Sequence, residues 1–255
     1  MALASFLFPD YIPARMIYAG SRGWDFYLAE KGRWRLHSHA ASLENQPFPR
    51  GSSCGLILNP GPLVYNLFSF ERLPRRQRER KDLVEWRLQK VFPDSLSTYK
   101  HYFLVIGSNT VLSLLINRDY LAGLERDLGE AGLEPVFIGN STVEIMNRLV
   151  IPDREPTLVL EMDGELNLAW VSTAGNPLYL RKFSISSAGE WSREVLRTVS
   201  YAAKNLDCRI ERFLLLSNND TDTESRAGEL VDAGLSPLNL KLDNPACLPA
   251  GRISS

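Results

Sequence analysis

Hydrophobic and polar residues alternate in three short runs within the first 40 residues. These runs carry aromatic and β-branched residues and are separated by the turn-forming segments 21–23 and 31–32. Alternation with a period of two is typical of strands that bury one face, and short turns join antiparallel neighbours. We therefore expect a three-strand meander over residues 15–20, 24–30 and 33–39.

The same pattern returns in the second half of the chain. Three more alternating runs, separated by turns that contain glycine, cover residues 158–162, 166–172 and 178–185. A repeated order of elements suggests an internal duplication. The sequence therefore predicts a second three-strand meander.

Elsewhere the apolar residues follow the 3.6-residue period of helices that bury one face, or form short runs that predict single strands. Ser141 would cap the helix that begins there. The predicted helices cover residues 75–92, 119–131, 141–149, 188–205 and 223–233. The further predicted strands cover residues 54–58, 63–70, 102–107, 111–116, 136–138, 213–216 and 238–240. Of these, the strands over 102–107 and 111–116 are expected to form a pair that turns at residues 108–109.

The composition changes at residues 151–156, which include two prolines and three charged residues. We place a lobe boundary there. The expected organisation is a first lobe over residues 1–152, a second lobe over 153–242 and a loosely ordered tail over 243–255. Each lobe would hold a mixed sheet that opens with a three-strand meander and is flanked by helices, which together make a two-lobed α/β fold.

The charges of the chain nearly cancel, since 29 Lys and Arg residues against 30 Asp and Glu residues give a formal net charge of −1. Domains whose main task is to coat nucleic acid are strongly basic, so we do not expect a nucleic-acid partner. No apolar stretch approaches the roughly 18 residues of a membrane-spanning helix, and a secretory leader is not expected because the apolar start lacks basic residues. Three widely separated cysteines fit a reducing compartment. The composition therefore favours a globular protein of a reducing compartment.

Four segments, over residues 81–93, 111–126, 130–135 and 164–185, resemble in this order segments of PilM-like and GspL-like proteins of type IV pilus and type II secretion machines. The helix that ends before Pro93 is similar to a helix of that family that also ends in proline. Residues 111–126 and 130–135 are similar to the family's strand, helix and return to the sheet. Residues 164–185 are similar to its second-lobe hairpin, in which an arginine, here Arg181, often follows the strand.

This resemblance implies the two-lobed fold of actin, hexokinase and Hsp70. It also implies a cytoplasmic protein at the periphery of the inner membrane, associated with the membrane indirectly. Its partner would be a cytoplasmic segment of a PilN-like or equivalent platform protein, which it would link to the assembly motor. An edge strand such as the one over 63–70 would suit strand addition by a partner. Contacts with the assembly ATPase itself and with a second copy of the chain are further expectations.

Proteins of the actin-like fold usually hold a nucleotide between their lobes. Turns from each lobe bind the phosphates through backbone N–H groups, and a carboxylate organises Mg²⁺ or the attacking water. In the first turn of this chain Gly20 and Ser21 are in place, but Tyr18 stands at the position of the expected carboxylate. The first lobe therefore lacks an acidic partner for Mg²⁺-ATP.

The second lobe also departs from the nucleotide-binding pattern. Glu161 and Asp163 supply acidic groups, but Gly164 is shifted by one position, and Asp163-Gly164 is equally what a plain hairpin turn requires. Ser217 ends the late strand and is followed by asparagines where a glycine pair would admit a nucleoside base. These departures predict a degenerate nucleotide site and a non-catalytic scaffold, with no cofactor and no metal.

The alternative is a functional ATP-binding or ATP-hydrolysing protein of the same system. Gly20 and Ser21 would then hold the phosphates of ATP, and Glu161 or Asp163 would hold Mg²⁺. No Ser-His-Asp set, Walker loop or dinucleotide fingerprint in the sequence points to another enzyme class.

The densest basic cluster contains Arg75, Arg76, Arg78 and Arg80 and stands at the start of a predicted helix. It could meet an acidic partner or anionic headgroups, although such a cluster is equally well a solvated helix start. Trp86 lies among charged residues of the same helix. Most tryptophans belong to the core, but this one could be an exposed anchor for a partner peptide. These five residues are the candidate partner-binding residues.

Overall fold

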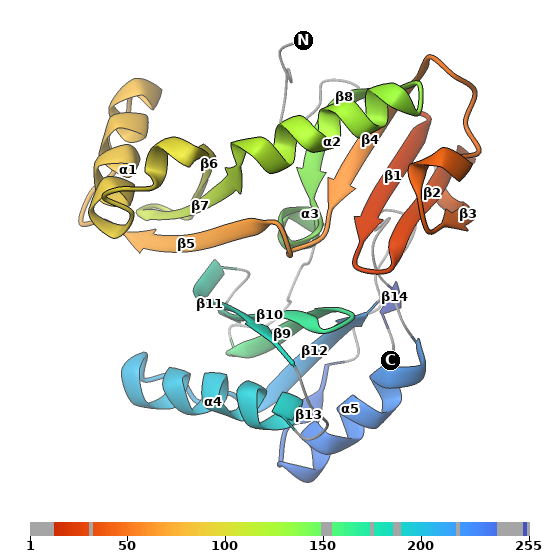
Figure 1. Ribbon diagram of the computed structural model, residues 1–255. Helices are drawn as coiled ribbons and strands as arrows, with labels where there is room; N and C mark the ends of the chain where they lie inside the picture. The colour runs from red at the N-terminus through yellow and green to blue at the C-terminus, as the bar shows by residue number, and fades with distance from the viewer. Residues whose placement is uncertain are drawn as a thin grey trace.

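The computed structural model describes residues 13–30, 33–148, 155–173, 176–185, 190–217, 220–238 and 252–253. The predicted lobe boundary at residue 152 and most of the predicted tail over 243–255 lie outside these residues. Within them, the expected α/β fold is confirmed, with two mixed sheets flanked by helices (Figure 1).

The first sheet has the strand order β3-β2-β1-β4-β8. It opens with the predicted antiparallel meander, and β4 then pairs with β1 in parallel and β8 with β4 in parallel. The strands are β1 (Arg15–Gly20), β2 (Gly23–Glu30), β3 (Arg33–Ala40), β4 (Ser52–Leu58) and β8 (Leu133–Asn140). Because β1, β4 and β8 run in the same direction, their carboxyl ends meet at one edge of the sheet.

The second sheet repeats this arrangement. Its order is β11-β10-β9-β12-β13, again with an antiparallel meander followed by parallel partners, while β14 pairs antiparallel with β12. The strands are β9 (Thr157–Asp163), β10 (Leu166–Thr173), β11 (Asn176–Ser184), β12 (Arg212–Ser217), β13 (Ser236–Pro237) and β14 (Arg252–Ile253). Of the strand predicted over 238–240, residues 239–240 lie outside the described residues, and β13 ends at Pro237.

A small third sheet is inserted into the first lobe between β4 and β8. It is antiparallel, with the order β5-β7-β6, and contains β5 (Leu63–Ser69), β6 (Tyr99–Ile106) and β7 (Thr110–Asn117). The predicted pairing of β6 with β7 is confirmed, whereas the addition of β5 to this pair as a separate sheet was not predicted. In Figure 1, β5 faces β11 of the second lobe.

The helices cover the faces of the sheets. They are α1 (Gln77–Val91), α2 (Arg118–Glu130), α3 (Ser141–Arg148), α4 (Glu190–Asn205) and α5 (Asp220–Asp232), with the short 3-10 helices η1 (Leu43–Asn45) and η2 (Leu96–Thr98). Helix α1 covers the small sheet through Val84 and Leu88, and α2 covers the first sheet. Helices α4 and α5 lie on the outer face of the second sheet (Figure 1).

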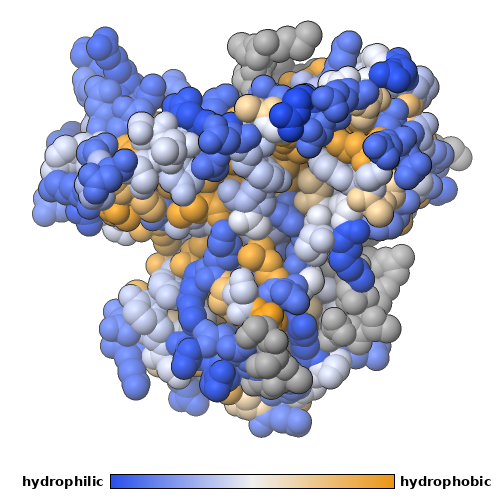
Figure 2. Space-filling model, viewed as in Figure 1, coloured by the Kyte–Doolittle hydropathy of each residue, from blue (hydrophilic) through white to orange (hydrophobic). Residues whose placement is uncertain are grey.

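Helix α3 joins the two lobes. Its Val143 belongs to the core of the first lobe, whereas Ile145 packs with Val159, Leu168 and Trp170 of the second sheet. The surfaces of α1 and α2 seen in Figure 2 are mostly hydrophilic, and apolar side chains gather beneath the small sheet where it faces the second lobe. Among the described helices, none is long and apolar enough to cross a membrane.

Candidate functional site

The parallel strands of both lobes end at a shared region between the sheets. In the first lobe Gly20, Asn59 and Asn140 stand at the carboxyl ends of β1, β4 and β8. In the second lobe Asp163 and Ser217 end β9 and β12. Ligands of open α/β sheets bind at such carboxyl edges, because the turns there expose backbone and polar side chains. This region is therefore the candidate site.

The two lobes touch directly through the turns that follow β1 and β9. The backbone N–H of Ser21 donates to Asp163 Oδ2 at 2.9 Å, and the Ser21 hydroxyl donates to Asp163 Oδ1 at 2.8 Å. Asn59 Nδ2 donates to Asp163 Oδ2 at 2.5 Å. The carboxylate of Asp163, a residue that is only 5% exposed, thus accepts three hydrogen bonds from the first lobe. This carboxylate therefore joins the two lobes through hydrogen bonds to a charged acceptor, which are stronger than those between neutral groups.

Gly164 allows this close approach of the two turns. Its φ of +64° is a conformation that side-chain-bearing residues rarely adopt, and a Cβ at this position would lie 2.7 Å from Ser21 Oγ. Gly20 is also crowded, since a Cβ there would lie 3.0 Å from Tyr18 Cε1. Tyr18, which stands where a carboxylate was expected, is buried in the first lobe.

Glu161 lies deeper in the same region and faces the start of α3. The hydroxyl of Ser141 donates to Glu161 Oε1, and the hydroxyl of Thr142 donates to Glu161 Oε2 at 2.6 Å. Burial raises the pKa of Glu161 to about 7, the two hydroxyl groups oppose that rise, and the nearby charge of Asp163 adds to it. Both oxygens of this carboxyl group are thus occupied by protein donors.

Asn140 organises the start of α3 beneath Glu161. Its Oδ1 accepts a bond of 3.3 Å from the backbone N–H of Val143 and one of 3.1 Å from the Tyr65 hydroxyl, while its Nδ2 donates to the carbonyl of Leu58 at 3.1 Å. The prediction that Ser141 caps this helix is therefore wrong. Asn140 is the capping residue, because the Ser141 hydroxyl is directed to Glu161.

The structure thus brings the predicted site residues to one region. Ser21, Asp163 and Gly164 are in mutual contact, and Glu161 lies two residues before Asp163 on β9. Ser217 is buried at the end of β12, opposite Met162 of β9. Residues 218–219, expected at the nucleoside position, lie outside the described residues.

The predicted partner-binding residues lie elsewhere, at the start of α1 and on its surface. Arg76 pairs with Glu79 at 3.4 Å, and Arg80 donates to the backbone carbonyls of Pro74 and Arg75 at 2.6 and 2.9 Å. Arg80 therefore binds the backbone that leads into α1, while Arg75, Arg76 and Arg78 are exposed.

Trp86 is 52% exposed, and Lys90 Nζ lies 3.6 Å from the centre of its ring. The expectation that this tryptophan lies outside the core is therefore confirmed. The helix presents one face of the indole to its own lysine, which keeps the ring oriented on the surface.

Several residues of the site were missed in the sequence. Asn59 was interpreted only as part of a turn, and Asn140, two residues past the strand predicted over 136–138, was not singled out. A polar residue that follows a buried strand nevertheless signals a carboxyl-edge site. Nothing in the sequence indicated that Thr142 and Tyr65 belong to the site, because their contacts depend on how α3 and β5 are placed.

Comparisons with solved structures identify the fold. The PilM-PilN type IV pilus biogenesis complex gives a TM-score of 0.65 at 15% identity, over 89% of this chain and 88% of that chain. A protein of Bacteroides thetaiotaomicron with an actin-like ATPase fold and unknown function gives 0.58 at 11% identity, over 88% and 90%.

The cytoplasmic domain of EpsL, an inner membrane component of the type II secretion system of Vibrio cholerae, gives 0.53 at 13% identity, over 80% and 83%. No family model matches the sequence, and a search of curated proteins gives no match. The two-lobed actin-like fold implied by the sequence resemblance to PilM-like and GspL-like proteins is therefore confirmed.

Proposed function

We propose that this chain is a non-catalytic cytoplasmic scaffold of an inner-membrane assembly platform, in a type IV pilus or type II secretion system. It binds a cytoplasmic segment of a PilN-like membrane partner and links that partner to the assembly motor. Support comes from the fold, which is similar to that of the PilM-PilN complex and of the EpsL cytoplasmic domain over most of each chain.

The contact between Ser21 and Asp163 carries this proposal. In an actin-like ATPase, the backbone N–H and hydroxyl groups of the first turn would serve the phosphates of the nucleotide. Here the Ser21 donors are directed to the carboxylate of Asp163, which takes the role of the anion. ATP would have to break this contact and bring its phosphates beside a carboxylate, which repels them.

The residues around this contact fit Mg²⁺-ATP poorly. Tyr18 is buried and supplies no carboxylate in the first turn, and both oxygens of Glu161 accept protein hydrogen bonds. The geometry therefore supports a site in which a protein carboxylate replaces the nucleotide as the bridge between the lobes.

The thermal midpoint of unfolding tests this part of the proposal. A ligand at about 100 times its dissociation constant should add roughly 2.7 kcal/mol to the stability of the folded chain. We expect no change in the midpoint with millimolar Mg²⁺-ATP, compared with Mg²⁺ alone and with Mg²⁺ and AMP. A clear rise that needs both ATP and Mg²⁺ would favour the alternative, a functional ATP-binding protein.

The partner-binding part of the proposal places the exposed face of α1 at the interface. Arg75, Arg76 and Arg78 are exposed at its start, and Trp86 is exposed near its middle. Capture of the membrane partner from solubilised inner membranes should fall with Trp86→Ala and with neutralisation of the three arginines. Val91→Ala, at a residue 48% exposed on the same helix, is the matched control.

A further inference from the structure

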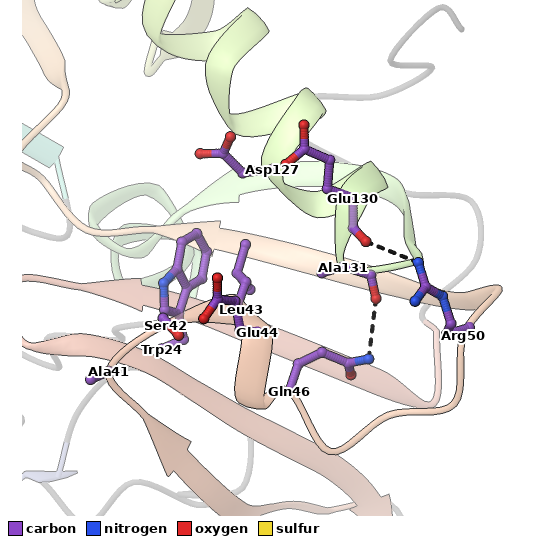
Figure 3. Close-up of a pocket in the computed structure, with 10 residues that line it drawn as sticks. All are labelled: Trp24, Ala41, Ser42, Leu43, Glu44, Gln46, Arg50, Asp127, Glu130 and Ala131. Carbon is purple, nitrogen blue, oxygen red and sulfur yellow. Dashed lines mark hydrogen bonds between the residues drawn. The ribbon is translucent and has the colours of Figure 1, made fainter.

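A pocket of about 740 Å³ opens on the first lobe, between η1 and the C-terminal end of α2 (Figure 3). Its volume lies within the range of roughly 300–1,000 Å³ that is usual for ligand pockets. The start of β2 contributes Trp24 to its wall. None of its lining residues belongs to the contact between Ser21 and Asp163, so it is a separate site.

The pocket is lined by three exposed carboxylate side chains, those of Glu44, Asp127 and Glu130. Within the described part of the chain, Asp127 pairs only with the neighbouring Arg126 at 3.3 Å, and the carboxylates of Glu44 and Glu130 form no ion pair. The lining thus carries three carboxylates against the single guanidinium of Arg50, and two of these carboxylates have no ion-pair partner among the described residues.

The one basic side chain in the lining serves the protein backbone. Arg50 Nη2 donates to the carbonyl of Glu130 at 3.1 Å, and Gln46 Nε2 donates to the carbonyl of Ala131 at 3.3 Å. In Figure 3 these two residues stand at one end of the pocket, whereas Trp24, Glu44 and Asp127 stand at the other. The end that holds Trp24, Glu44 and Asp127 therefore has no basic side chain of the lining beside it.

Trp24 identifies the kind of cation that fits. Its indole is half-buried against the core of the first lobe and also forms part of the pocket wall. An aromatic face beside carboxylates suits a guanidinium group, which can stack on the ring and form paired hydrogen bonds to a carboxylate. A metal ion is a poorer match, because no three His, Cys, Asp or Glu side chains among the described residues, those of this pocket included, are placed to hold one.

We infer that this pocket binds an arginine-containing part of the cytoplasmic segment of the membrane partner. The inference rests on the proposed function, because it identifies the ligand through the location of that partner. Segments on the cytoplasmic side of membrane helices are enriched in Lys and Arg. An acidic pocket with an aromatic wall is complementary to such a segment.

Fluorescence anisotropy with a labelled hexapeptide of four arginines and two leucines tests this inference. The double variant Glu44→Gln/Asp127→Asn should bind the peptide at least about tenfold more weakly, and Trp24→Leu about three- to tenfold more weakly. Because the two carboxylates are exposed, the double variant should keep the fold, which circular dichroism checks.

The matched control is Glu125→Gln/Glu134→Gln, which removes two exposed carboxylates outside the pocket and should leave the affinity unchanged. A peptide with citrulline in place of arginine should lose binding. Equal affinities of pocket and control variants, or equal binding of the citrulline peptide, would overturn the inference. Spermidine binding as tightly as the peptide would also overturn it, because the pocket would then serve a free cation.

A membrane capture experiment separates this inference from the proposed function. If Glu44→Gln/Asp127→Asn captures the membrane partner as well as the unmodified chain does, the inference fails and the scaffold proposal stands. If the arginine peptide binds in the pocket but no platform protein is captured by any form of the chain, the scaffold proposal fails while the cation site stands.

Discussion

Lys182 of β11 donates a hydrogen bond of 2.7 Å from its ammonium group to the backbone carbonyl of Leu63, at the start of β5. A second bond of 2.9 Å reaches the carbonyl of Gly61. Burial lowers the pKa of this lysine. The contact joins the second lobe to the small sheet and occupies the backbone where strand addition to β5 would begin.

Replacing this lysine should weaken the connection between the lobes. Lys182→Met removes both donors and leaves the Leu63 carbonyl without its partner, so we expect a loss of about 1 kcal/mol in the free energy of unfolding. Urea denaturation measures it. Arg72→Met, which removes an exposed cation from the loop after β5, should have no effect. Equal losses in the two variants would show that the interlobe bonds contribute nothing.

The carboxylate of Asp163 should contribute more to the free energy of unfolding than the ammonium group of Lys182 does. In Asp163→Asn the charge is lost, and the new amide must face the Ser21 and Asn59 donors with only one acceptor oxygen. We expect a loss of about 1.5–3 kcal/mol in the free energy of unfolding, the usual value for hydrogen bonds to a charged group. Urea denaturation measures this loss. The control is Glu165→Gln, an exposed substitution in the same turn, which should leave the free energy of unfolding nearly unchanged.

The local parts of the fold could be predicted from the sequence, and the long-range parts could not. Both meanders were predicted because an antiparallel hairpin needs only alternation and a turn, as between β9 and β10. The parallel pairing of β1 with β4 and the separate small sheet depend on contacts between distant segments, which a single sequence does not reveal.

The same limit applies to the candidate site. Ser21 and Asp163 were recognised as members of two turns, yet nothing in the sequence indicated that one would bind the other across 142 positions. Asn140 and Ser141 show a second limit. Both residue types cap helices, and only the position of Glu161 decides that Ser141 is used elsewhere.

Glu161 should make stability depend on pH. Burial raises its pKa to about 7 in the folded chain, from 4.5, so between these values the folded state binds more protons than the unfolded state. The free energy of unfolding should therefore fall as pH rises from about 4.5 to 7, by an amount on the order of 3 kcal/mol, and Glu161 adds no further slope above that range.

Urea denaturation at pH 5, 6, 7 and 8 measures this slope. Glu161→Gln should flatten it, and Glu165→Gln should retain it. Asp163→Asn should reduce it in part, because the charge of Asp163 contributes to the raised pKa of Glu161. An unchanged slope in Glu161→Gln would assign the pH dependence to other groups.

Replacing Gly164 by alanine should cost more stability than the strain of its backbone conformation alone would cause. Its φ is +64° and that of Gly234 is +88°, so alanine is strained at both positions and should cost about 1 kcal/mol at each. At Gly234 nothing lies within 4 Å of the new Cβ, whereas at Gly164 it would lie 2.7 Å from Ser21 Oγ. Gly164→Ala must therefore also push the two turns apart and lengthen the bonds to Asp163, so it should lose at least about 1 kcal/mol more than Gly234→Ala.

A double-mutant cycle tests this reasoning by urea denaturation. In a Ser21→Ala background the hydroxyl that crowds the new Cβ is absent, so the extra loss caused by Gly164→Ala should shrink toward the loss seen at Gly234. Gly164→Ala and Gly234→Ala losing the same stability, with no coupling between positions 21 and 164, would contradict the direct contact of the lobes through these two turns.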